Sequence, residues 1–146
     1  MSGEASNTKL SPRIDFYILS ERLNRLTFLG KLVDQLYRDG QKVHIHTDDE
    51  TLANQVDKAL WTASDTSFVP HELCGNGDGA IMIGVNDSSS HQNIMVNLAN
   101  EVPDEFDSFA RVVEIIDPQE TLKQIGREHF KFYKKKGLEI HNHSIN

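Results

Sequence analysis

The sequence predicts a single α/β domain with a mainly parallel sheet of about five strands flanked by helices. Three observations support this prediction. Short runs rich in β-branched residues alternate with longer runs of helical spacing, as in β-α-β units. The length of 146 residues fits one domain. With 38% hydrophobic and 25% charged residues, the composition is that of a folded globule and not of a disordered chain.

The predicted strands are short runs rich in strand-forming residues, bounded by polar or turn-forming residues. They cover Ile14 to Leu19, Lys42 to Thr47, Ala80 to Gly84, Asn93 to Leu98 and Val112 to Ile116. Between the first two strands, apolar residues recur at helical spacing, and Gly40 marks the end of that helix. These apolar residues are Leu26, Leu29, Val33, Leu36 and Tyr37. The pattern is typical of a Rossmann-like sheet.

The second helix is predicted to begin at a capping box over Thr47 to Glu50. The Thr47 side chain would cap the helix, and Glu50, three residues later, would bind a free amide in return. Apolar residues then fall on one stripe that faces the sheet: Leu52, Val56, Ala59 and Leu60. Trp61 falls on the opposite side of this helix.

The last helix has the clearest boundaries. Asp117 is a candidate N-cap, Pro118 suits the first turn, and Gly137 can adopt the left-handed conformation that ends a helix. The predicted helix therefore runs from about Pro118 to Lys136. The domain is expected to span residues 13–137, with a flexible leader at 1–12 and a flexible tail at 138–146.

Charge and composition restrict the function. The chain has 15 basic and 22 acidic side chains, a net charge of −7, which argues against a broad nucleic-acid-binding surface. The single cysteine, Cys74, cannot form an internal disulfide and suits a reducing cytoplasm. No apolar run is long enough to cross a membrane, and residues 1–12 lack the hydrophobic centre of a signal peptide. We therefore expect a cytoplasmic protein that contacts no membrane.

Asp48, Asp49 and Glu50 follow the second predicted strand, at the edge of the sheet where enzyme sites collect. A metal or phosphate site would need a further carboxylate from another strand end. Because a capping box explains these residues locally, helix capping is the preferred interpretation. A small metal-dependent hydrolase or phosphotransferase that uses Asp48 and Asp49 is the alternative.

Other candidate sites have simpler explanations. His44 and His46 point to one face of a strand, but zinc normally takes three or four protein ligands. Cys74 and His71 lack a third group that would orient them for nucleophilic catalysis. The glycines at 75, 77 and 79 precede a strand, whereas a dinucleotide-binding loop follows one. We expect no catalytic residue, bound metal or cofactor.

The last helix carries a cationic face that includes an aromatic residue. From Gln119 to Gly137, six Lys or Arg and two Glu give a local charge of +4, against −11 in the rest of the chain. At about 100° per residue, the cations share one sector with a phenylalanine, and the apolar residues occupy the opposite sector. The residues of the cationic face are Lys123, Arg127, Phe130, Lys131 and Lys134.

Several interpretations of this face are open. Lysines near a helix end can simply solvate it and offset its dipole. Phe130 among the cations equally fits a groove for an acidic peptide that carries an apolar side chain. Single-stranded nucleic acid could bind along Lys123 to Lys136, although the acidic remainder of the chain disfavours this. A second apolar cluster is either a satellite of the core or an interface. Its members are Trp61, Phe68, Val69 and Pro70.

Seven short blocks of the sequence, taken in order, resemble those of one protein family. They are residues 13–19 (RIDFYIL), 43–50 (VHIHTDDE), 59–61 (ALW), 67–71 (SFVPH), 97–103 (NLANEVP), 109–116 (FARVVEII) and 127–133 (REHFKFY). Each block alone is weak, but together they resemble the chi subunit of bacterial DNA polymerase III holoenzyme. The likeness covers nearly the whole chain, from about Arg13 to Gly137.

The resemblance implies a non-catalytic accessory subunit of the clamp-loader assembly, with no cofactor. In this family, chi pairs with the psi subunit and grips the acidic C-terminal tail of single-stranded-DNA-binding protein, which couples the polymerase to coated template. The chain would be a monomer alone and a heterodimer with psi. It would lie in the bacterial cytoplasm, near the nucleoid through the replisome, without strong direct nucleic-acid binding.

The resemblance also implies residues for two binding surfaces. The family positions that hold the tail match Ile116, Arg127, Phe130 and Lys131. The helix geometry adds Lys123 and Lys134. Some family members have a phenol at the position of Phe130, so a hydroxyl contact is missing here. The psi side matches Trp61 and Phe68, and we include the adjacent Val69 and Pro70.

Overall fold

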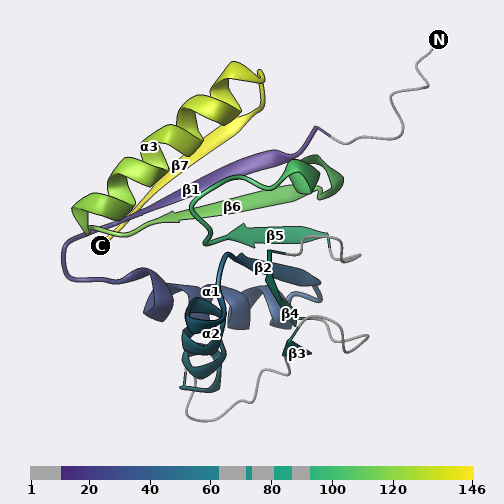
Figure 1. Ribbon diagram of the computed structural model, residues 1–146, viewed down its shortest axis with the longest axis vertical. Coiled ribbons are helices and arrows are strands. Elements are labelled where there is room, and N and C mark those ends of the chain that lie inside the picture. The colour runs from purple at the N-terminus through teal and green to yellow at the C-terminus, as the bar shows by residue number, and fades with distance from the viewer. Residues whose placement is uncertain (1–10, 63–71, 74–80, 87–92) are drawn as a thin grey trace.

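The computed structural model describes residues 11–62, 72–73, 81–86 and 93–146. The strands in this part of the chain are β1 (Arg13–Leu19), β2 (Val43–Thr47), β3 (Glu72–Leu73), β4 (Ile81–Val85), β5 (Ile94–Asn97), β6 (Arg111–Ile116) and β7 (Ile140–Ile145). The helices are α1 (Arg25–Arg38), α2 (Glu50–Thr62), the 3-10 helix η2 (Asp104–Ser108) and α3 (Glu120–Lys135). The strands form one parallel sheet in the order β3-β4-β2-β5-β6-β1-β7, which confirms the predicted α/β class (Figure 1).

Helices lie on both faces of the sheet (Figure 1). α1 and α2 pack together on one face, and α3 and η2 cover the other. Successive side chains of a strand point to opposite faces, so each central strand serves two cores. On β1, Leu19 and Tyr17 join the core under α1 and α2, whereas Ile14 and Phe16 join the core under α3.

The first predicted helix is confirmed in position and in orientation. Leu29, Val33 and Leu36 of α1 are buried. The Asn24 side chain caps the helix by accepting a hydrogen bond from the Thr27 amide at 2.9 Å. Gly40 follows the helix with φ +80°, a conformation that glycine adopts without strain.

The predicted capping box of α2 is wrong. Thr47 still belongs to β2, and its buried hydroxyl donates to the Gly84 carbonyl at 2.8 Å, so it cannot cap the helix. Asp49 takes this role, because its Oδ1 accepts a hydrogen bond from the Leu52 amide at 2.7 Å. The predicted buried stripe is present, with Val56 and Leu60 in the core.

The last helix begins two residues later than predicted, at Glu120. The Asp117 carboxylate accepts hydrogen bonds from two backbone amides, those of Gln119 at 2.9 Å and Arg25 at 2.8 Å. It therefore joins the start of α1 to the turn before α3, instead of capping α3 directly. Gly137 follows α3 with φ +75°, as its predicted role requires.

The prediction of a flexible tail at 138–146 is wrong, because Ile140–Ile145 form strand β7. This strand pairs in parallel with β1 from Ile14 to Leu19 and forms an edge of the sheet. The two-residue strand β3 is the other addition to the five strands that we predicted. Docking of β7 matters for function because this strand lies beside α3 (Figure 1).

Candidate functional site

A groove beside α3 brings together most of the residues predicted on the cationic face. We call it the α3 groove; its volume is about 500 Å³. It is lined by Phe16, Ile18, Ile116, Lys123, Gly126, Arg127, Phe130 and Asn142. These residues come from β1, the end of β6, α3 and β7. The lining is mostly apolar, with the cations of α3 along one side.

Four of the six predicted tail-binding residues line this groove: Ile116, Lys123, Arg127 and Phe130. Lys131 and Lys134 are exposed on α3 but lie outside the lining. The Nζ of Lys134 is 5.9 Å from the centroid of the Phe130 ring, close enough for a cation–π contact. The Nζ of Lys131 is 3.9 Å from Glu128. Lys134 therefore contacts a wall of the groove through the ring of Phe130, whereas Lys131 is paired with Glu128 outside the groove.

Phe130 is half-buried and forms a wall of the groove. Its ring packs edge-on against Phe16, with the ring centroids 5.4 Å apart. Ile18 lies further along β1 and is 40% exposed, which is unusual among the large apolar side chains that the structure describes. Phe130 and Ile18 together expose an apolar surface that can hold a side chain of a bound partner.

Four residues of the groove were not predicted from the sequence: Phe16, Ile18, Gly126 and Asn142. Phe16 and Ile18 lie on the same face of β1, but periodicity does not indicate which face lacks a covering helix. Gly126 is a buried helical glycine on the side of α3 that faces Ile116. The absence of a side chain in the middle of a predicted amphipathic helix was the available signal for close approach. Asn142 lies on β7, which we expected to be flexible.

The Arg127 guanidinium already has two partners in this structure. Its Nη1 lies 3.4 Å from Oε2 of Glu120 and 3.3 Å from Oε1 of Gln124. The Arg127 and Glu120 side chains are 57% and 78% exposed, so this ion pair is in contact with solvent. Exposed pairs of this kind are typically worth no more than about 1 kcal/mol. Arg127 is thus held over the groove by contacts that a ligand can replace.

A buried polar cluster fixes the inner side of α3. Glu114 of β6 accepts hydrogen bonds from the Tyr133 hydroxyl at 2.7 Å and from the side-chain amide of Asn97 at 3.0 Å. Its other oxygen lies 2.9 Å from Nδ1 of His129, and Nε2 of His129 lies 2.8 Å from the Asn100 carbonyl. These contacts set the rotation of α3 and thereby turn Arg127 and Phe130 toward the groove.

The cluster also shifts two pKa values. Burial disfavours the charged form of His129, but the hydrogen bond and the charge of Glu114 outweigh this effect, so the pKa of His129 is raised. Burial and the charge of Glu114 both raise the pKa of Tyr133 well above its usual value. The phenol is therefore neutral near pH 7, and its hydroxyl donates a hydrogen bond to Glu114.

A second polar cluster attaches β7 to the sheet on the opposite face. The fully buried Asp15 carboxylate contacts Arg111 at 2.6 Å, His143 at 2.9 Å and Arg13 at 3.1 Å. Burial alone would raise the pKa of Asp15, but the hydrogen bonds of His143 and Arg111 and the charges of Arg111 and Arg13 lower it overall. His143 also stacks on Tyr17, with ring centroids 4.7 Å apart. These contacts hold Asn142 at the groove.

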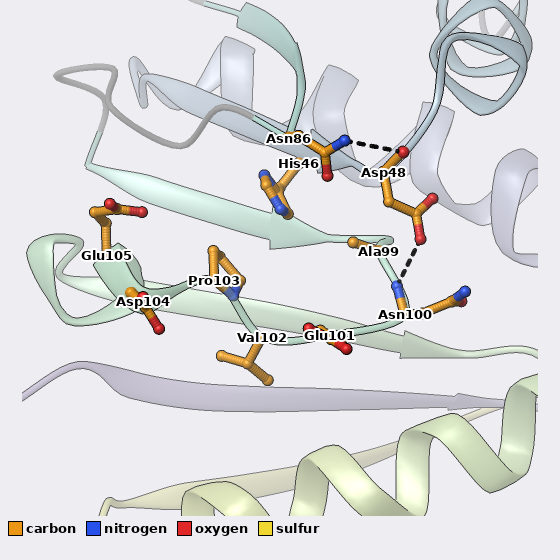
Figure 2. Close-up of a pocket in the computed structure, with 10 residues that line it drawn as sticks. All are labelled: His46, Asp48, Asn86, Ala99, Asn100, Glu101, Val102, Pro103, Asp104 and Glu105. Atoms are coloured by element: carbon orange, nitrogen blue, oxygen red, sulfur yellow. Dashed lines mark hydrogen bonds between the residues drawn. The ribbon is translucent and has the colours of Figure 1, made fainter.

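A separate polar pocket of about 470 Å³ lies at the carboxyl ends of β2, β4 and β5 (Figure 2). The Asn86 side chain donates to the Asp48 carbonyl at 3.2 Å, and the Asn100 amide donates to the Asp48 carboxylate at 3.0 Å. In Figure 2 these two hydrogen bonds tie the loops after β2, β4 and β5 to one another at one end of the pocket. Asp104 and Glu105 line its other end.

The contacts of the two aspartates after β2 are those of structural residues. Asp49 caps α2, and Asp48 orders the loop around Asn100. Among the residues that the structure describes, no group of three or more His, Cys, Asp or Glu is arranged to hold a metal ion. His44 and His46 are buried in β2, and the His44 ring stacks on Phe109 with centroids 5.8 Å apart. The contact of the His44 ring is therefore that of a packed core residue.

The predicted psi-binding residues fall mostly in segments without a described structure. Trp61 lies in α2, while Phe68, Val69 and Pro70 lie outside the described residues, as do Cys74, His71 and the glycine-rich segment. Within the described ranges, none of the helices has the length and apolar character required to span a bilayer.

Fold and groove together define an α/β domain with a cationic groove over an apolar floor, and comparison with known proteins identifies its family. Residues 12–141 match the family described as "DNA polymerase III chi subunit, HolC". The chain therefore belongs to the DNA polymerase III chi subunit family, and it is an accessory subunit of DNA replication. This confirms the resemblance inferred from the seven sequence blocks.

Curated relatives agree with this assignment over nearly their whole length. The DNA polymerase III subunit chi of Escherichia coli strain K12 is 32% identical over 136 residues, which cover 86% of this chain and 92% of the relative. The protein of the same name from Pseudomonas aeruginosa is 27% identical over 137 residues, or 91% of this chain and 96% of the relative. The protein of the same name from Haemophilus influenzae is 27% identical over 138 residues, which cover 89% of this chain and 95% of the relative.

Proposed function

We propose that this protein is a non-catalytic subunit of the clamp-loader assembly that bridges the psi subunit and the acidic C-terminal tail of single-stranded-DNA-binding protein. The observation that carries the proposal is the α3 groove, where an apolar floor adjoins the guanidinium of Arg127 and the ammonium of Lys123. A short anionic tail with an apolar side chain matches both features.

The geometry suggests how such a tail would bind. An apolar side chain would lie between Ile116 and Phe130, and a carboxylate would pair with Arg127 beside Lys123. Lys131 and Lys134 are exposed nearby and would attract the remaining acidic residues. The cations concentrate on α3, while the rest of the chain is acidic, so the field directs an anionic tail to this helix.

A disordered tail pays an entropic cost when it binds, so one peptide should bind weakly, with a Kd on the order of micromolar. Several tails on an oligomeric partner would raise the overall affinity without new contacts. Salt should weaken binding because the contacts that steer it are exposed charges.

A calorimetric titration with the synthetic tail peptide tests the proposal. Arg127→Ala should weaken binding by about 10-fold or more, since it removes the cation at the groove. Lys135→Ala is the matched control, because it removes an exposed cation of α3 that does not line the groove. The control should stay within about 2-fold of the unchanged protein. Equal losses in both variants would defeat the assignment of the tail to this groove.

The psi side of the bridge rests on the family alone. Trp61, Phe68, Val69 and Pro70 are the proposed contact residues. Co-purification with the psi subunit tests this: Trp61→Ala should release psi while the tail peptide still binds. If Trp61→Ala retains psi at unchanged affinity, psi binds at a different surface.

A further inference from the structure

The guanidinium proposed to receive the ligand is occupied by the chain itself. Glu120 lies in the first turn of α3, two turns before Arg127, and its Oε2 is 3.4 Å from Nη1 of Arg127. Glu120 is not part of the groove lining, so its carboxylate reaches Arg127 from outside the groove. A carboxylate-bearing ligand would meet an existing ion pair at this point.

The contact continues along the exposed side of α3. Gln124 accepts from Arg127 at 3.3 Å and donates to Glu128 at 3.4 Å, and Glu128 lies 3.9 Å from Lys131. Arg127 and Lys131, the two cations in this series of contacts, are therefore each paired with one glutamate. Only the pair of Glu120 and Arg127 involves a cation that lines the groove, since Lys131 lies outside it.

We propose that Glu120 is a specificity-determining residue, a built-in competitor whose carboxylate a ligand displaces from Arg127. This inference rests on the proposed function, which supplies the anionic tail as ligand. A ligand carboxylate that replaces Glu120 must first break this exposed ion pair, so it gains less from Arg127 than it would from an unpaired guanidinium. Net binding then depends on the apolar side chain that enters the groove between Ile116 and Phe130. Glu120 thereby disfavours acidic peptides that lack this side chain.

The test compares Glu120→Gln with the matched control Glu128→Gln. Both substitutions remove one negative charge from the exposed side of α3, so they change the long-range field similarly. They differ in that Glu120 touches Arg127 directly, whereas Glu128 reaches it only through Gln124. Circular dichroism and thermal melting verify that both variants remain folded, because Glu120 also complements the helix dipole.

Each protein is titrated with the tail peptide and with a version in which the apolar side chains of the last three residues are alanine. Glu120→Gln should tighten binding of the tail peptide about 3-fold, and Glu128→Gln less than about 1.5-fold. The alanine peptide should gain at least as much from Glu120→Gln, so discrimination between the two peptides does not rise. The dependence of affinity on salt should steepen in Glu120→Gln, since one more ion pair forms on net.

Two outcomes separate this inference from the proposed function. If the unchanged protein does not bind the tail peptide, the proposed function fails and the inference fails with it. If the peptide binds but Glu120→Gln and Glu128→Gln have equal effects, the competitor role of Glu120 is overturned while the proposed function stands.

Discussion

Gly126 faces the side chain of Ile116 so closely that a β-carbon at position 126 would overlap the Cδ1 atom of Ile116. The missing side chain lets α3 approach the end of β6 at the floor of the α3 groove. The depth of the groove therefore depends on the absence of a side chain at position 126.

We predict that Gly126→Ala weakens binding of the tail peptide by about 10-fold with all groove charges intact. The added methyl group would force the end of Ile116 toward the groove and reduce its depth. Calorimetric titration measures the effect. Thr121→Ala, an exposed change on the same helix, should leave affinity unchanged.

The double variant Gly126→Ala with Ile116→Val isolates the cause. Valine lacks the Cδ1 atom with which the new methyl group collides, so the double variant should bind more tightly than Gly126→Ala alone. If the second substitution restores nothing, the contact between these residues does not control the groove.

Stability should depend on pH through His129. Its folded pKa is raised above the unfolded value of 6.5, so its contribution to stability is fully present below about pH 6.5 and is lost as pH rises through the folded pKa. Urea unfolding at several pH values from 6 upward should show the free energy of unfolding falling through this range.

The same series with His129→Gln identifies the titrating group. The difference between the two curves should carry the pH dependence of His129, because the other histidines are common to both proteins. Parallel curves would show that Glu114 does not stabilise a charged His129 in the fold.

We predict that His143→Ala lowers the free energy of unfolding by about 1 kcal/mol. The change removes the 2.9 Å contact with the buried Asp15 and the stacking on Tyr17. It should also weaken tail binding, because β7 carries Asn142 at the groove. His141→Ala is the control, since His141 pairs with the exposed Glu139 instead. Equal stability of both variants would mean that Asp15 does not anchor β7.

The central strands and the three main helices could be predicted from local patterns. Runs such as 81–85 are apolar because a parallel strand buried on both faces leaves no polar side. The stripe of Leu29, Val33 and Leu36 and the glycine after α1 likewise depend on residues close in sequence. Predictions of this kind failed at two caps. The hydroxyl of Thr47 bonds a neighbouring strand that is distant in sequence. Asp117 accepts from the amides of Gln119 and Arg25 and does not cap α3.

Strand β7 could not be predicted, because its residues alternate weakly and the strand is held by contacts from far along the chain. Asp15 is 128 positions from His143, and no spacing rule connects them. The same limit applies to the groove. Periodicity placed Arg127 and Phe130 on one face of a helix, but Ile18 and Asn142 join them only through the order of strands in the sheet.

The most direct test is to map the bound tail peptide on the folded protein by backbone amide NMR. The account predicts that the largest shift changes lie at Gly126, Arg127, Phe130 and Asn142, and that Arg127→Ala requires about 10-fold more peptide to produce them. Changes centred instead on the polar pocket around Asp48 and Asn100, or an unperturbed α3, would contradict it.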